Sequence, residues 1–306
     1  MLPNNKIEYL TRKEIDIEKW NACIENASNG LIYSFSYYLD ALCTNWDALV
    51  INNYEAVMPL PWRKKWGFYY IYQPYFIAAL GVFGNEVPAS TIELCLHYIP
   101  PKFRYLEIDL NEKNSVNTFP GLKATTRKNI FLELNQPYEI LFKNYKRLAR
   151  RKINYALENG LIIHDEISPE VIVKLYERYY EQEKRIIPHE AYTGLIKALN
   201  ALPKKNLRAY LVKNENNIIA FYVVLVDDKN VYSLIGGSTK EGKKMGAFYL
   251  ATDAVIKEFS ATGKTFRFEG SDIKGIAFFD MQFGSYPITY LHIKQNKLPW
   301  PFYHFK

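Results

Sequence analysis

Apolar and polar positions alternate most clearly in the second half of the chain. Residues 207–213 (LRAYLVK) alternate as a half-buried strand does, and four polar residues separate them from the long apolar run 218–226. A second polar turn leads into residues 231–235, which are predicted to form a strand that stops at Gly236 and Gly237. We predict three antiparallel strands joined by short turns.

A helix and two more strands are predicted after these. Residues 246–259 carry apolar positions near the helical period of about 3.6 residues, and Gly263 marks the end of this segment. Residues 265–269 and 288–293 are predicted as strands, with a short helical stretch between them. The order is therefore three strands, a helix, a strand, a short helix and a strand.

The first half shows a similar order, although no sequence identity between the two halves is visible. Residues 46–51 and 56–60 form a predicted hairpin around a polar turn, and residues 68–72 form a third strand. A predicted helix over residues 91–98 follows. The remaining strands predicted in this half are 105–110 and 129–134.

Mixed sheets with a central crossover helix imply layers of helices packed on a sheet. We therefore predict an α/β (α+β) protein with two tandem halves, residues 1–135 and 136–306. Each half is predicted to hold a mixed, mostly antiparallel sheet that is flanked by helices.

A basic helix is predicted to bridge the two halves, over residues 137–160. Pro137 stands near its first position and Gly160 follows its last, which is the usual asymmetry of helix ends. On a helical wheel the apolar residues gather on one side, and Lys152 is the one misfit among them. The opposite side gathers the polar residues Lys143, Lys146, Arg147, Arg150 and Asn154. Two further helices are predicted, from Pro169 to about Glu183 and over residues 191–199.

The composition agrees with a folded protein of two domains. The chain has 306 residues, of which 48% are hydrophobic and 16% aromatic, and this excludes global disorder. Its net charge of +7 favours polyanionic partners such as phosphates, nucleotides or RNA where the charge is clustered. The N-terminal residues lack the apolar core of a signal peptide, and no segment has the ~18–20 apolar residues of a membrane span. We expect a soluble, cytoplasmic protein.

Neither the cysteines nor the histidines show the spacing of a metal site. Cys23, Cys43 and Cys95 lie in the first third of the chain, and reduced, buried thiols are the simplest interpretation. The five histidines are scattered, and none has H-x-x-x-H spacing. No metal is predicted.

Four short stretches, taken in order, resemble the FemABX-like peptidyl and aminoacyl transferases and the related BioF2-like acetyltransferases of bacteria. The first is MPLP (58–61) with YQPYF (72–76) and LG (80–81), and the second is the basic helix YKRLARRKINYA (145–156) with GL (160–161). The third is FEGS (268–271), and the fourth is FF (278–279) with FG (283–284) and Tyr290. The resemblance implies two tandem halves of the GNAT (acyl-CoA N-acyltransferase) fold.

The same resemblance implies an activity. The group transfers an acyl or aminoacyl group from acyl-CoA or aminoacyl-tRNA to an amine acceptor, here a cell-wall or lipid precursor. The donor is then a substrate, no tightly bound cofactor is expected, and tRNA is a candidate partner. The chain lacks the long coiled-coil insertion of some FemABX members, so no elongated arm that grips tRNA is expected.

Such a transfer needs a held donor, a stabilised oxyanion and a base for the amine. The resemblance places glycines and lysines after residue 235 where the GNAT fold holds the donor's pyrophosphate. The motif is a degenerate version of the usual one. The alternative interpretation is an ordinary solvated turn. The predicted loop residues are Gly236, Gly237, Lys243, Lys244, Gly246 and Ala247. Glu269 or Asp272, after a strand, is the candidate base, unless these carboxylates only cap the next helix.

The acceptor is predicted to bind to the basic helix, through Lys143, Arg147, Arg150 and Asn154, with Gln73 and Tyr75 lining a cleft between the halves. Asp280 stands where the group commonly has a basic residue, which together with the degenerate loop indicates a changed donor or lost activity. Two hypotheses therefore remain. One is an acyltransferase, and the other is a non-catalytic, degenerate tandem GNAT module that binds a nucleotide or nucleic acid through its basic helix.

Overall fold

The computed structural model describes residues 6–117, 120–165, 168–182 and 187–304. The chain packs into two units, Met1–Arg127 with Thr289–Lys306, and Lys128–Ile288. The predicted division at residue 135 did not anticipate that the last segment returns to the first unit. It does so because the strand that contains His292 pairs with the strand that ends at Asp109.

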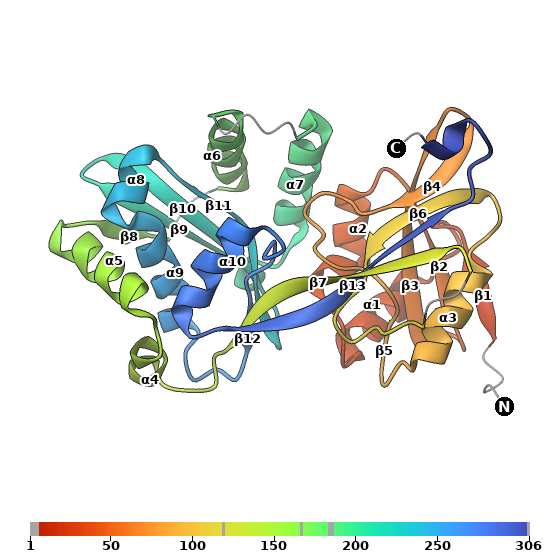
Figure 1. The fold of residues 1–306 in the computed structure, drawn as a ribbon, viewed down its shortest axis with the longest axis horizontal. Coiled ribbons are helices and arrows are strands. Elements are labelled where there is room, and N and C mark those ends of the chain that lie inside the picture. The colour runs from red at the N-terminus through yellow and green to blue at the C-terminus, as the bar shows by residue number, and fades with distance from the viewer. Residues whose placement is uncertain (1–5, 118–119, 166–167, 183–186, 305–306) are drawn as a thin grey trace. The chain divides into compact units, whose positions relative to one another are not determined.

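The first unit is a sheet in the order β1-β2-β3-β4-β6-β13, with β5 paired to β3 (Figure 1). Its strands are β1 (Ile7–Leu10), β2 (Trp46–Ile51), β3 (Ala56–Lys65), β4 (Phe68–Tyr72), β5 (Phe83–Gly84), β6 (Phe103–Asp109) and β13 (Tyr286–Asn296). Its helices are α1 (Ile17–Asn26), α2 (Ser36–Leu42) and α3 (Ala89–Tyr98), with the 3-10 turns η1 (Ile32–Ser34) and η4 (Phe302–His304). The pairs are antiparallel except β4 with β6.

The strands and the helix predicted in the first half are present, although the strand predicted at 129–134 begins as early as Leu122 and the other elements differ by a few residues at their ends. The segments that precede β2 were not predicted. Helix α1 is capped by Asp16, whose side chain accepts a hydrogen bond from the backbone N–H of Lys19. It buries Trp20 against Trp46 of β2, with ring centroids 5.0 Å apart. The helix also buries Ile24, one turn after Trp20.

The second unit is a sheet in the order β7-β12-β11-β10-β9-β8. Its strands are β7 (Leu122–Glu133, entering the unit at Lys128), β8 (Ile162–His164), β9 (Leu207–Asn214), β10 (Asn217–Val226), β11 (Asn230–Ser238) and β12 (Thr265–Arg267). Its helices are α4 (Tyr138–Lys143), α5 (Arg147–Glu158), α6 (Pro169–Gln182), α7 (His189–Ala201), α8 (Lys240–Met245), α9 (Ala247–Glu258) and α10 (Lys274–Asp280), with η2 (Lys204–Asn206) and η3 (Met281–Phe283). All pairs are antiparallel except β11 with β12. The predicted end of α6 at Glu183 lies outside the described residues.

Helices pack on both faces of this second sheet (Figure 1). Side chains alternate across a strand, so Tyr222 and its register partner Tyr210 face the core that includes α5 and α9. Phe221 faces the other way, and its ring lies 6.4 Å from that of Tyr176 on α6. The predicted mixed, mostly antiparallel sheet flanked by helices is confirmed.

The predicted bridging helix 137–160 is wrong as one continuous helix. It is two helices, α4 and α5, separated at residues 144–146. The break buries Tyr145, whose ring lies 5.1 Å from that of Phe283, and the backbone N–H of Lys146 donates to the carbonyl of Gln282. A tertiary contact thus takes a hydrogen bond that a continuous helix would have made internally.

The predicted end of a strand at Gly236 and Gly237 is also wrong, because β11 continues to Ser238. Gly236 and Gly237 remain paired with Tyr222 and Phe221 of β10. Their missing side chains leave room for aromatic rings: a Cβ on Gly236 would lie 2.8 Å from Phe248, and one on Gly237 2.7 Å from Tyr179. These glycines are packing positions within a strand. In the described part of the chain, no helix is long and apolar enough to cross a membrane.

Candidate functional site

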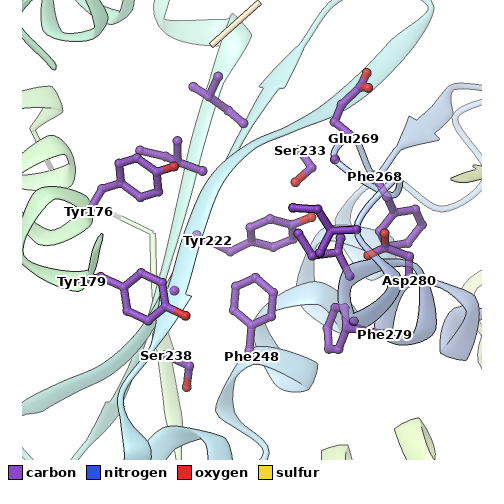
Figure 2. Close-up of a pocket in the computed structure, with 18 of the residues that line it drawn as sticks. Tyr176, Tyr179, Tyr222, Ser233, Ser238, Phe248, Phe268, Glu269, Phe279 and Asp280 are labelled. Atoms are coloured by element: carbon purple, nitrogen blue, oxygen red, sulfur yellow. The ribbon is translucent and has the colours of Figure 1, made fainter. Parts of the chain in front are cut away.

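A cavity of about 740 Å³ lies in the second unit, where β11 and β12 separate (Figure 2). The two parallel strands pair only from Asn230 with Thr265 to Tyr232 with Arg267, and β11 then runs on to Ser238 without β12. A register shift in the pairing with β10 places a bulge at Leu234, at the point of separation. Along a strand, the backbone N–H and C=O groups point alternately to its two edges. The groups of β11 that do not pair with β10 therefore point toward this opening.

Aromatic side chains from several elements line the cavity. Figure 2 shows Tyr176 and Tyr179 of α6 on one side and Phe268 and Phe279 on the other, with Tyr222 of β10 between them. Binding sites for organic ligands are usually of this kind, mainly apolar with a few placed polar groups.

Glu269 is one of these polar groups. It directly follows Phe268 and has a φ of 53°, and Gly270 after it has a φ of 67°, so the chain turns sharply away from the sheet here. One carboxylate oxygen accepts a hydrogen bond of 2.5 Å from the amide of Asn129, and the other accepts one of 3.2 Å from Arg267 Nε. Arg267 is buried, and with the Asn129 amide it fixes the carboxyl group of Glu269 at the cavity wall.

Asp280 is a second carboxyl group in the cavity, and in the sequence it stands out only as a departure from the family pattern. It is buried at the end of α10, and the hydroxyl of Ser271 donates a hydrogen bond of 2.8 Å to its Oδ2. Burial, opposed by the Ser271 hydrogen bond and aided by the negative charge of Glu269, raises the pKa of Asp280 to about 8. A signal was present in the sequence, because Asp280 directly follows the aromatic pair Phe278-Phe279.

The segment predicted as a phosphate loop folds largely as the short helix α8. Thr239 caps it by accepting a hydrogen bond of 3.0 Å from the N–H of Gly242, and Gly246, with a φ of 77°, ends it and begins α9. Of the predicted loop residues, Gly236, Gly237, Lys243 and Gly246 line the cavity. Lys244 is exposed and Ala247 is buried in the core, and neither lines it.

Asp272 and the predicted residues of the basic helix do not line this cavity. Asp272 is exposed, directly after the buried Ser271. The residues Lys143, Arg147, Arg150 and Asn154 are all exposed on α4 and α5, and the opposite side of α5 is buried through Ala149, Ile153 and Ala156. The predicted amphipathic arrangement of this segment is therefore present.

Gln73 and Tyr75 belong to the first unit. Gln73 lines a second cavity, of about 480 Å³, but both ends of its amide bind backbone: Nε2 donates to Ile77 O at 2.6 Å, and Oε1 accepts from Asp109 N at 3.0 Å. Tyr75 is exposed and does not line that cavity. Nearby, the ring nitrogens of His292 lie 2.9 Å from Asp109 and 3.3 Å from a Glu107 carboxylate oxygen. Among the residues that the structure describes, no group of three or more His, Cys, Asp or Glu side chains is arranged to hold a metal ion.

Comparison with known proteins agrees with this geometry. Residues 143–271 match the family model of the acetyltransferase (GNAT) domain. FemX has a similar structure, with a TM-score of 0.65, 12% sequence identity, and coverage of 93% of this chain and 96% of FemX. A conserved protein of unknown function from Bacteroides thetaiotaomicron gives a TM-score of 0.62 at 12% identity, over 95% of this chain and 100% of that protein.

A third similar structure is the C-terminal domain of a protein described as a lysylphosphatidylglycerol synthetase from Agrobacterium fabrum. Its TM-score is 0.57 at 9% identity, and the match covers 92% of each chain. No curated protein sequence matches this chain. The protein therefore has an acyltransferase-type GNAT fold. Over most of its length this fold is similar to that of FemX, which agrees with the resemblance of the four sequence stretches.

Proposed function

We propose that this protein transfers an acyl or aminoacyl group from acyl-CoA or aminoacyl-tRNA to an amine acceptor. The observation that carries the proposal is the position of Glu269, a carboxylate held by Arg267 and Asn129 in the wall of the cavity between β11 and β12. A fixed carboxylate beside unpaired strand edges supplies the base and the backbone donors that acyl transfer needs.

The donor is proposed to enter with its phosphates near Lys243 and Gly246, at the start of α9, and with its acyl group between the separated strands. The N-terminus of a helix attracts anions through its N–H groups and its dipole, and Lys243 adds a positive charge. Backbone N–H groups of β11 that point away from β10 would then stabilise the oxyanion. The cavity volume of about 740 Å³ suits a ligand of this size.

In the proposed reaction, Glu269 accepts a proton from the attacking amine. A carbon–nitrogen bond forms, and the carbon–sulfur bond of a thioester donor or the carbon–oxygen bond of an aminoacyl ester breaks. The aromatic wall formed by Tyr222, Phe248 and Phe279 excludes water, which protects the donor from hydrolysis.

The acceptor is proposed to be a cell-wall or lipid precursor whose phosphates meet the exposed basic face of α5. The similar protein from Agrobacterium fabrum is named for joining lysine to a phospholipid, which supports an acceptor of this type. Arg147, Arg150 and Asn154 supply that face, with Lys143 at the end of α4. Because the proposed donors are made in the cytoplasm, we place the reaction there.

The exposed basic face also favours a second candidate function. A non-catalytic module that binds a nucleotide or nucleic acid through α5 would need this face and none of the cavity. The degenerate phosphate motif fits that alternative, whereas the placement of Glu269 within the cavity does not.

Isothermal titration calorimetry with acetyl-CoA, longer acyl-CoAs and charged tRNA separates the two. The transferase should bind at least one of these donors, and Gly236→Ala, which places a methyl group against Phe248 and Tyr222 in the cavity, should weaken that binding by about tenfold or more. Gly263→Ala is the control, because Gly263 does not line the cavity and a Cβ there would meet nothing within 4 Å. The non-catalytic alternative would be supported if tRNA bound, if removing the positive charges of α5 weakened that binding, and if Gly236→Ala did not.

A further inference from the structure

Two carboxyl groups face the same cavity from different surroundings. Glu269 is paired with Arg267, while the groups that act on Asp280 are the hydroxyl of Ser271 and the negative charge of Glu269. Tyr222 of β10 also faces them, but burial raises the pKa of its phenol well above the ordinary value, so it adds no charge. Glu269 thus lies beside a buried cation, whereas the surroundings of Asp280 stabilise its neutral, protonated form.

A chain of hydrogen-bonding side chains fixes the two carboxyl groups relative to each other. Ser271 Oγ lies 2.8 Å from Asp280 Oδ2 and 3.4 Å from Asn129 Oδ1, and the amide nitrogen of Asn129 lies 2.5 Å from Glu269. The hydroxyl of Ser285 donates to the backbone carbonyl of Asp280 at 2.7 Å, which holds the end of α10 in place. Figure 2 shows both carboxyl groups on the same side of the cavity.

We propose that Asp280 is the proton donor of the transfer reaction and that it protonates the leaving sulfur or oxygen of the donor. This inference rests on the proposed function and completes its proton balance. The amine attacks the acyl carbon and gives a proton to Glu269, the bond to the leaving atom breaks, and that atom takes the proton of Asp280. After the products leave, water enters the cavity and carries a proton from Glu269 to Asp280, which restores both groups.

The protonation of Asp280 can be measured without any substrate. In protein labelled with ¹³C at the aspartate carboxyl carbons, one resonance should titrate near pH 8 and be absent from Asp280→Asn. Ser271→Ala removes the hydrogen bond to the anion and should move this midpoint up, whereas Glu269→Gln removes the nearby negative charge and should move it down. The inference is overturned if every aspartate resonance of the wild type titrates below pH 6.

Kinetics then test the role of this proton. The rate of the wild type should fall as pH rises through about 8, because Asp280 must be protonated to act. Asp280→Asn should lower kcat by about 10²–10⁴-fold and lose this alkaline fall, and Ser271→Ala should shift the fall to higher pH. Asp228→Asn, an exposed aspartate in the turn between β10 and β11, is the matched control and should behave as the wild type.

The two proposals fail in different ways. If the wild type turns over a donor but Asp280→Asn keeps both its rate and its alkaline fall, Asp280 is not the proton donor and the proposed function stands. If the wild type turns over no donor, the proposed function fails, and the role of Asp280 fails with it.

Discussion

The side chain of Lys152 donates a hydrogen bond of 3.0 Å to the backbone carbonyl of Lys244. This contact joins the basic helix α5 to the last turn of α8, directly before Gly246. It also explains why Lys152 falls on the apolar side of its helix: the ammonium group satisfies a carbonyl at a helix end that has no partner within the helix. The basic helix and the start of α9 therefore hold each other in place.

Gly246→Ala should destabilise the protein. Gly246 has a φ of 77°, and a Cβ there would lie 2.6 Å from the carbonyl oxygen of Lys152. The left-handed conformation alone should cost about 1–2 kcal/mol, and the clash should raise the total to about 3 kcal/mol or more. Gly263→Ala is the matched control, since its φ is 72° and its Cβ would meet nothing within 4 Å. Urea unfolding measures both losses of stability. If Gly246→Ala and Gly263→Ala lost the same free energy of unfolding, the contact with Lys152 would not contribute.

The stability of the protein should fall as pH rises toward 8 because of Asp280. Between the ordinary pKa of an aspartate and the raised pKa of about 8, the folded state holds a proton that the unfolded state has released. The free energy of unfolding should therefore drop by up to about 1.4 kcal/mol per pH unit in that range. Asp280→Asn removes this pH dependence. The free energy of unfolding of the variant, minus that of the wild type, should therefore increase as pH rises from 5 to 7.5. Urea unfolding curves measure both free energies, and a difference between the two proteins that stays the same at every pH would contradict this.

Arg267 and Glu269 should be strongly coupled. Their side chains are largely buried and lie 3.2 Å apart, so Arg267→Met leaves a carboxylate with its cation removed. We expect a loss of about 3–5 kcal/mol for this variant, and a smaller loss for the double variant with Glu269→Gln, which removes the stranded charge. Simple addition of the two single effects in a double-mutant cycle would argue against the ion pair.

The exposed cations of α5 should determine the affinity for polyanions. The double variant Arg147→Ala, Arg150→Ala should lower the affinity for RNA. It should also make the slope of log K against log salt concentration less steep by about two, because two fewer phosphates are neutralised. Lys204→Ala, Lys205→Ala removes two exposed charges elsewhere in the same unit and is the control. Fluorescence anisotropy over a range of salt concentrations measures both effects. Equal losses from the two pairs would indicate non-specific charge attraction.

Much of the fold could be predicted from the sequence, because strand alternation and polar turns are local signals. Strands β9 and β10 and helix α9 lie within a few residues of their predicted positions. The break at Tyr145 and the continuation of β11 through Gly236 could not be predicted, because each depends on a ring from a distant segment, Phe283 in one case and Phe248 in the other.

The site was predictable in part for the same reason. The placement of Glu269 at the cavity wall could be predicted because it follows a predicted strand, and that of the glycines and Lys243 because they lie around the start of a predicted helix. The raised pKa of Asp280 could not be predicted, since it depends on burial and on Ser271, nine residues earlier in the sequence. Charge state in a cavity depends on three-dimensional surroundings that no local pattern records.

The most direct test of the proposed transfer is the release of free CoA or deacylated tRNA by the purified protein, with a panel of acyl-CoAs, aminoacyl-tRNAs and amines, compared between the wild type and Glu269→Gln. The account predicts turnover by the wild type with at least one donor and acceptor pair. It predicts that Glu269→Gln loses about 10²–10⁴ in kcat while its donor Kd stays unchanged. Equal rates for the two proteins, or no turnover with any pair, would contradict it.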